Sequence, residues 1–131
     1  MAKQKKSPKK TILVIEDDRN LLFPITKKLE QRDYKVLTAA KVDAAISQLK
    51  KAAHIDVIWL DHYLQGDEDG IDFTNKIRKN KKYKSIPIFV ISASTSDGKV
   101  LSYLDLGVYE HFGKTDYSLD EIIDRIEICL K

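Results

Sequence analysis

The sequence predicts an α/β fold: a five-stranded parallel sheet with helices on both faces. Five short apolar runs recur along the 131-residue chain, and the segments between them show the 3.6-residue periodicity of amphipathic helices. Near-continuous apolar strands that alternate with such helices are typical of a parallel sheet with right-handed crossovers and both faces buried. The predicted strands are residues 11–15, 34–38, 55–60, 88–92 and 109–112.

The predicted helices follow from apolar residues at helical spacing. One helix carries Val42, Ala45, Ile46 and Leu49 on a single face, and the last carries Leu119, Ile122, Ile123, Ile126 and Leu130. Ser118 followed three residues later by Glu121 is a capping-box pattern, which predicts where the last helix begins. Pro24 lies inside the first predicted helix, where it removes a backbone hydrogen bond. We therefore expect a kink or a late helix start there.

The positive charge of the chain is concentrated at its beginning. The formal net charge is +3, from 23 basic and 20 acidic residues, and residues 1–10 hold five lysines and no acid. The remainder therefore has 18 basic residues against 20 acidic ones, or −2. We expect residues 1–10 to be a flexible basic tail and residues 11–131 to form one folded domain. Because the excess lies on the tail, nucleic-acid binding is not expected.

Composition excludes several other classes. No apolar stretch approaches the ~20 residues that a membrane span requires, and the basic beginning lacks the apolar core of a secretory signal. A single cysteine cannot form an internal disulfide, so a cytoplasmic protein is expected. Cys129 shares the apolar stripe of the last helix, which predicts a packing role. His54, His62 and His111 lack the spacing of zinc ligands.

Polar side chains follow the predicted strands where each strand ends. In open parallel sheets, ligands bind beyond the carboxyl ends of the strands, so these side chains are candidates for a common site. Acidic residues that meet at one edge would repel each other without a cation, and oxygen ligands suit Mg²⁺. The residues in question are Glu16, Asp17, Asp18, Asp61, Ser92 and Lys114.

These residue types suit phosphoryl transfer to a carboxylate. Asp61 can attack phosphorus to give an aspartyl phosphate. The metal would neutralise charge on the transferring group, the Lys114 ammonium can pair with one of its oxygens, and the Ser92 hydroxyl can donate to another.

Four landmarks in order give the chain a resemblance to a known family. They are residues 14–18, 59–61, 91–93 and 107–114, at separations that fit the family's spacing. Over residues 11–130 the chain resembles the receiver domains of two-component response regulators, and it is similar to stand-alone chemotaxis-type regulators. The resemblance implies a flavodoxin-like sheet with strand order 2-1-3-4-5.

The resemblance also implies roles for individual residues. Asp17 and Asp61 would bind Mg²⁺ (or Mn²⁺) directly, the backbone carbonyl of Tyr63 would be a third ligand, and Glu16 would act through water. Asp61 would be the phosphoacceptor.

Three further residues would respond to the phosphoryl group. The hydroxyl of Ser92 would swing toward it, and the ammonium of Lys114 would follow. His111 occupies the place where the family usually has a tyrosine or phenylalanine that turns inward on activation.

The implied partners are a histidine kinase or histidine phosphotransfer protein as phosphodonor, and a downstream protein bound at the surface of the fourth helix, fifth strand and fifth helix. Apart from self-phosphorylation and self-dephosphorylation on Asp61, no enzymatic activity is expected. Since the sequence ends after the last helix, we expect no output domain. The alternative is a degenerate receiver that acts as a constitutive protein-interaction module.

The chain departs from the family's pattern at several positions. Thr115 stands where the family usually has a proline after a cis peptide bond, which puts the reach of Lys114 in question because a cis bond before threonine costs about 2.5–4 kcal/mol. Gln65 replaces another usual proline, and Gly70 lies one residue farther along than is common. The acidic loop between them lacks the glycine spacing of an EF-hand. A flavin protein or phosphohydrolase on the same fold is not favoured, since no phosphate-binding loop follows Ile15.

Overall fold

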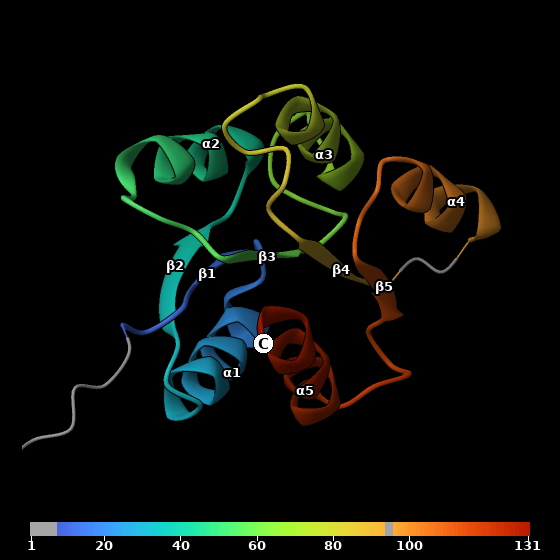
Figure 1. Ribbon diagram of the computed structural model, residues 1–131. Helices are drawn as coiled ribbons and strands as arrows, with labels where there is room; N and C mark the ends of the chain where they lie inside the picture. Colours follow the sequence, from blue (N-terminus) through green and yellow to red (C-terminus); the bar gives the residue numbers. More distant parts are fainter. Residues whose placement is uncertain (1–7, 94–95) are drawn as a thin grey trace, which may run out of the picture.

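The computed structural model describes residues 8–93 and 96–131, and Figure 1 shows strands and helices alternating along the chain. The strands are β1 (Thr11–Ile15), β2 (Lys35–Ala39), β3 (Val57–Leu60), β4 (Ile88–Ser92) and β5 (Glu110–Gly113). The helices are α1 (Arg19–Gln31), α2 (Val42–Lys51), α3 (Gly70–Arg78), α4 (Asp97–Asp105) and α5 (Leu119–Leu130).

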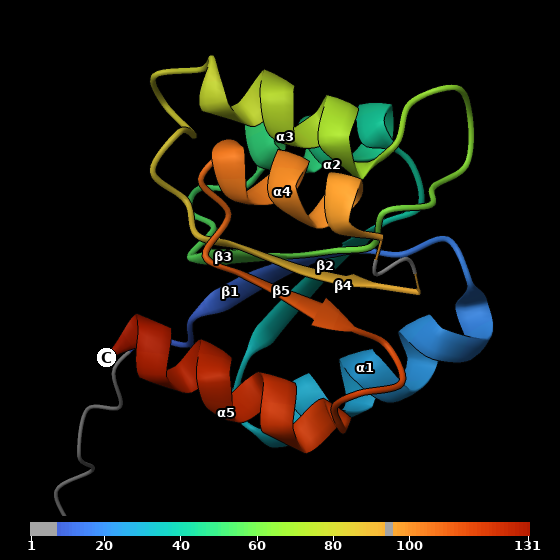
Figure 2. The same cartoon turned by 90° about the vertical axis from the view of Figure 1, so that its right-hand side faces the viewer.

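The strands form one parallel sheet in the order β2-β1-β3-β4-β5, as predicted. Figure 2 shows that α1 and α5 cover one face of this sheet, whereas α2, α3 and α4 cover the other. Every residue of the central strands β1, β3 and β4 is buried. This burial on both faces explains the near-continuous apolar runs in the sequence.

Alternation along the strands divides the core into two layers. Ile12 and Val14 of β1 pack with α1 and α5, whereas Leu13 and Ile15 pack with the opposite layer of helices. The same alternation continues past the strand ends, because successive side chains point to opposite faces of a sheet. The residues that follow β1 and β3 are therefore also directed alternately to one side and the other.

Three strands differ from their predicted bounds: all three begin later than predicted, and β2 and β5 also end one residue later. Tyr34, Ile55 and Tyr109 were assigned to strands from their apolar character, but β2, β3 and β5 begin one to two residues later. Tyr34 and Ile55 are nevertheless buried in the core. Burial and strand pairing are separate properties, and an apolar run marks the first more reliably than the second.

The starts of α1 and α5 are both set by capping side chains. The capping box of Ser118 and Glu121 is confirmed at the start of α5. Of the kink or late start expected at Pro24, the late start is wrong: α1 begins at Arg19, with Asp18 as N-cap, and continues through Pro24. Asp18 accepts a hydrogen bond from the backbone N–H of Asn20, which fixes the start of the helix well before the proline.

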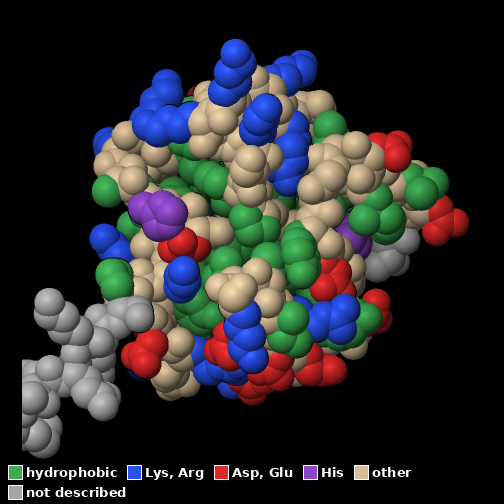
Figure 3. All heavy atoms as spheres, viewed as in Figure 1, with side chains coloured by type: hydrophobic (Ala, Val, Ile, Leu, Met, Phe, Trp, Pro, Cys, Tyr) green, Lys and Arg blue, Asp and Glu red, His purple; other side chains and the backbone are tan. Residues whose placement is uncertain are grey.

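Charged groups are distributed unevenly over the surface. In Figure 3, Lys and Arg side chains gather over α2 and α3, and acidic side chains gather over α1 and α5. Arg32, the C-cap residue of α1, donates to Glu127 at 2.9 Å and also to Asp124, so ion pairs join the end of α1 to α5. Cys129 is partly buried and packs against the same layer, as predicted.

Two further expectations concern the basic tail and membrane-spanning helices. Of the predicted basic tail, residues 1–7 lie outside the described residues. Within the described ranges, no helix combines the length and apolar character needed to cross a membrane.

Candidate functional site

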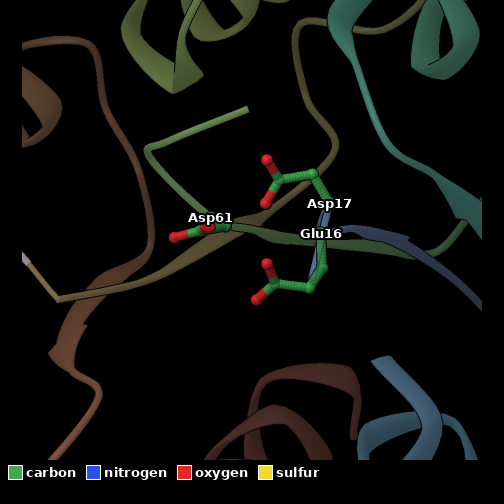
Figure 4. A group of neighbouring side chains, drawn as sticks. All are labelled: Glu16, Asp17 and Asp61. Atoms are coloured by element: carbon green, nitrogen blue, oxygen red, sulfur yellow. The ribbon is translucent and has the colours of Figure 1, made fainter. Parts of the chain in front are cut away.

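Three acidic side chains meet at the carboxyl edge of the sheet (Figure 4). Glu16 and Asp17 directly follow β1, and Asp61 directly follows β3; the two strands are neighbours, with Ile15 opposite Leu60. One carboxylate oxygen from each acid lies within 4.8 Å of those of the other two. Glu16 and Asp61 are buried, and Asp17 is half-buried. The predicted acidic cluster is thus assembled from two strand ends.

Asp18 does not join this cluster, although it follows the same strand. Its side chain caps α1, and its backbone N–H donates to Oε2 of Glu16 at 3.2 Å. The strand-end argument therefore named one acid too many. The helix that follows β1 requires an N-cap, and Asp18 satisfies that requirement.

Lys114 completes the site from the end of β5. Its Nζ lies 3.1 Å from Oε1 of Glu16 and 3.4 Å from Oδ1 of Asp61. Its backbone N–H donates to the carbonyl of Ser92 at 3.0 Å, which ties the ends of β4 and β5 together. With all groups ionised, three carboxylates against one ammonium leave two negative charges.

This concentration of charge shifts the ionisation of its members. Burial raises the pKa of Glu16, and the nearby charge of Asp61 raises it further. Burial also raises the pKa of Asp61, although Lys114 opposes that shift. For Lys114, burial alone would lower the pKa, but the charge of Asp61 and the hydrogen bond to Glu16 outweigh it and the pKa rises. The raised pKa values of Glu16 and Asp61, together with the raised pKa of Lys114, indicate a site that favours additional positive charge.

The donor set fits a divalent cation of the hard type. It offers only oxygen atoms, from a small number of carboxylates, with Asp17 remaining partly open to solvent. Tyr63 follows Asp61 by two residues, so its backbone carbonyl belongs to the same loop. These residues could hold Mg²⁺ or Mn²⁺.

Ser92 and His111 lie in β4 and β5, which are on the opposite side of β3 from β1. Ser92 ends β4, is fully buried and pairs with Gly113 of β5. His111, in β5, is half-buried, and its Nε2 has no hydrogen-bond partner among the described residues. Burial lowers the pKa of His111. The His111 ring lies 5.9 Å from that of Tyr103 in α4. Both predicted switch residues are thus associated with β5, the strand that α4 contacts: His111 lies within it, and Ser92 pairs with its Gly113.

Sequence reasoning missed His62, which was considered only as a zinc ligand. His62 directly follows Asp61 and is buried, and its Nδ1 lies 2.6 Å from the hydroxyl oxygen of Tyr103. Burial lowers the pKa of His62 and raises that of Tyr103. Adjacency to Asp61 was the only available signal, because nothing in the sequence pairs His62 with a particular helix residue.

The departures from the family's pattern have structural outcomes. No peptide bond in the described ranges is cis, so the bond between Lys114 and Thr115 is trans, and Lys114 still reaches both acids. Gln65 forms an isolated bridge with Lys41. Gly70 begins α3 close to the backbone of Asp61: a Cβ at Gly70 would lie 2.9 Å from the Asp61 carbonyl oxygen.

Together, the fold and the site define a class of protein: a doubly wound α/β domain with an acidic, lysine-bearing site at the carboxyl edge of its sheet. Residues 12–127 match the response regulator receiver domain family. The chain belongs to that family, whose members are phosphorylation-dependent signalling domains of two-component systems. The constitutive interaction module considered above is not favoured.

Comparisons with individual proteins agree with this membership. The chain is 32% identical over 122 residues to the transcriptional regulatory protein YvrH of Bacillus subtilis, covering 92% of the chain and 49% of YvrH. The chain thus spans about half the length of the curated relatives it matches. A response regulator receiver protein from Pseudomonas putida has the same fold, with a TM-score of 0.85 at 19% identity, covering 94% of this chain and 99% of that one. The non-phosphorylated HemR receiver domain from Leptospira biflexa gives a TM-score of 0.81 at 28% identity, covering 94% and 95%.

Proposed function

We propose that residues 11–131 form a receiver domain in which Asp61 accepts a phosphoryl group in a metal-dependent reaction, and that the modification changes the partner-binding surface. One observation carries the proposal: Asp61 lies both within an acidic cluster suited to a divalent cation and 3.4 Å from the ammonium of Lys114. A capping or turn aspartate needs neither neighbour.

Asp17 and Asp61 would hold Mg²⁺ or Mn²⁺ directly, together with the backbone carbonyl of Tyr63, and Glu16 would contribute through water. When bound, the cation neutralises charge that develops on the transferring phosphoryl group. The raised pKa of Glu16 and the oxygen-only donor set support this assignment.

The transfer itself is a displacement at phosphorus. A carboxylate oxygen of Asp61 forms the new O–P bond while the bond from phosphorus to the donor breaks. That bond is P–N in a phosphohistidine and P–O in acetyl phosphate, and its electron pair leaves with the donor. Lys114 would pair with one phosphoryl oxygen and the Ser92 hydroxyl would donate to another. Hydrolysis by water would later return the Asp61 carboxylate and inorganic phosphate.

The proposed donor is a histidine kinase or a histidine phosphotransfer protein. The proposed output is a protein bound at the surface of α4, β5 and α5, where Leu101, Leu104 and Tyr109 are exposed. Movement of Ser92 toward the phosphoryl group, with His111 turning inward, would connect the site to that surface. A charge-assisted hydrogen bond contributes about 1.5–3 kcal/mol, so two of them approach the ~5.5 kcal/mol that inverts a 1:99 equilibrium.

Incubation with acetyl phosphate and Mg²⁺, followed by intact-mass measurement, tests the proposal. We expect the wild type to gain the mass of one phosphoryl group, and we expect no gain with Asp61→Asn or with EDTA in place of Mg²⁺. Asp56→Asn is the matched control: Asp56 precedes the same strand at its opposite end and should leave the adduct intact. Absence of an adduct on the wild type would overturn the proposal in favour of the degenerate receiver.

A further inference from the structure

Helix α4 reaches the loop that carries Asp61 through a buried hydrogen bond. The hydroxyl oxygen of Tyr103, in α4, lies 2.6 Å from Nδ1 of His62. Both side chains are buried, at 0% and 3% exposure, so water does not compete for either polar group. A buried hydrogen bond of this kind specifies geometry strongly, because breaking it would leave polar atoms without a partner.

The surroundings of His62 assign the direction of this hydrogen bond. Its Nε2 lies 3.7 Å from Oδ2 of Asp69, a carboxylate that can only accept. A neutral imidazole has one protonated nitrogen, and the carboxylate favours the proton on Nε2. Nδ1 is then the acceptor, and the Tyr103 O–H donates to it.

The backbone of His62 is held at the same time. Its N–H donates to Oδ1 of Asp61 at 2.8 Å, and its carbonyl accepts from the N–H of Gly70 at 2.9 Å. The backbone N–H that contacts the Asp61 carboxylate therefore belongs to His62, the residue that Tyr103 anchors. The His62 carbonyl belongs to the peptide that joins His62 to Tyr63, whose own carbonyl is the predicted metal ligand. A displacement of His62 as a whole would therefore shift both backbone groups, and the hydrogen bond to Tyr103 opposes such a displacement.

A second contact from α4 reaches the next residue of the loop. Nζ of Lys99 lies 2.8 Å from the hydroxyl oxygen of Tyr63 and 4.8 Å from the centre of its ring. Lys99 and Tyr103 are four residues apart, which places them on the same side of α4. One helix face thus contacts two consecutive residues of the loop.

We infer that Tyr103 is a positioning residue for the Asp61 site: acting through His62, it holds the Asp61 carboxylate and the Tyr63 carbonyl in the arrangement that binds the metal ion. The inference rests on the proposed function and extends it by making α4 part of the site. Since linkage is reciprocal, a partner that displaces α4 also changes the metal affinity.

Binding of Mn²⁺, followed by electron paramagnetic resonance, tests the inference directly. Tyr103→Phe removes one oxygen and should weaken Mn²⁺ binding about threefold to tenfold, as expected for one lost hydrogen bond. Phosphorylation by acetyl phosphate at subsaturating Mg²⁺ should slow by a similar factor. The matched control is Tyr83→Phe, which alters another buried tyrosine of the same core layer, remote from the loop, and should bind Mn²⁺ like the wild type.

A rescue separates positioning from general packing. His62→Asn keeps an acceptor oxygen near the place of Nδ1, whereas His62→Leu keeps bulk without polarity. We expect the asparagine variant to bind Mn²⁺ more tightly than the leucine variant, with all affinities measured well below the unfolding temperature of each protein. Equal affinity of Tyr103→Phe and wild type, or no advantage of asparagine over leucine, would overturn the inference.

The two proposals fail in different ways. If the wild type forms no adduct but Tyr103→Phe still loses Mn²⁺ affinity, the proposed function fails and the positioning role stands. If the wild type forms an adduct and Tyr103→Phe matches it in affinity and rate, the positioning role fails and the function stands. A wild type that neither forms an adduct nor binds Mn²⁺ overturns both.

Discussion

The ammonium nitrogen of Lys114 lies 3.4 Å from a carboxylate oxygen of Asp61, and it bonds to Glu16 on its other side. The side chain that directly follows β5 thus connects the residues at the ends of β1 and β3. Lys114 is about one quarter exposed, so this contact is less screened than a surface ion pair.

Replacing Lys114 with methionine should slow phosphorylation of Asp61 without preventing it. The methionine keeps the length of the side chain but removes the charge that, in the proposed function, would pair with a phosphoryl oxygen. A charge-assisted hydrogen bond contributes about 1.5–3 kcal/mol, so we expect the rate with acetyl phosphate to fall by about tenfold to a hundredfold. Stopped time courses read by intact mass measure this rate. Lys50→Met, at an exposed position of α2, should react like the wild type, and an unchanged rate for Lys114→Met would remove the lysine from the mechanism.

Replacing Glu16 with glutamine should stabilise the fold at pH 8 in the presence of EDTA. The pKa of Glu16 is raised from 4.5 to about 7 by burial and by Asp61, so the folded state binds more protons than the unfolded state between these values. The stability of the wild type therefore falls as pH rises through this window. Glutamine avoids the buried charge, and we expect a gain on the order of 1–3 kcal/mol at pH 8 that shrinks toward pH 5.

Urea denaturation at the two pH values measures this difference. Glu30→Gln, at an exposed position of α1, is the control and should show a smaller dependence. A gain from Glu16→Gln that is equal at pH 5 and pH 8 would contradict the electrostatic explanation. Mg²⁺ should stabilise the wild type, because the folded state alone presents the acidic cluster.

Replacing Gly70 with alanine should be costly. The new Cβ would lie 2.2 Å from the hydroxyl oxygen of Tyr103 and 2.9 Å from the carbonyl oxygen of Asp61. Overpacking of this kind typically costs about 1–3 kcal/mol, and here it would also displace the loop that carries Asp61. Thermal unfolding and Mn²⁺ affinity should both decline. Gly98→Ala in α4 meets no atom within 4 Å and should be neutral or slightly stabilising; equal behaviour of the two variants would refute this view of Gly70.

Replacing Arg78 with methionine should destabilise the fold without involving the site. The guanidinium of Arg78 donates to the carbonyls of Leu106 and Gly107 after α4, and to those of Lys84 and Ile86 before β4. Methionine retains the packing but removes the donor from two partly buried hydrogen bonds, to Leu106 and Ile86, and from two exposed ones, at about 2–4 kcal/mol in total. Urea denaturation measures this loss.

The exposed Arg125, which pairs with Glu110, provides the comparison. Arg125→Met should cost no more than about 1 kcal/mol, as is usual for exposed ion pairs. If the two arginine variants lose the same stability, the carbonyl contacts of Arg78 do not have the importance assigned to them.

Much of the fold could be predicted because burial on both faces leaves a direct trace in the sequence. Strands β1 and β4 consist of buried residues alone, and their predicted and observed bounds coincide. The starts of β2 and β3 could not be predicted to the residue, since Tyr34 and Ile55 are buried without strand pairing. Of the two outcomes expected from Pro24, the late helix start did not occur for a local reason: the cap at Asp18 starts α1 before the proline is reached.

The acids and the lysine of the site could also be predicted, because parallel strands deliver the residues after their carboxyl ends to one edge. Glu16, Asp17, Asp61 and Lys114 meet there for that reason alone. The sequence by itself therefore determined the sheet, the edge and the chemical types gathered at it. Only the tertiary structure decided that His62 meets Tyr103, because the rotation and position of a helix over a sheet are set by packing of the whole core layer, which no local spacing records.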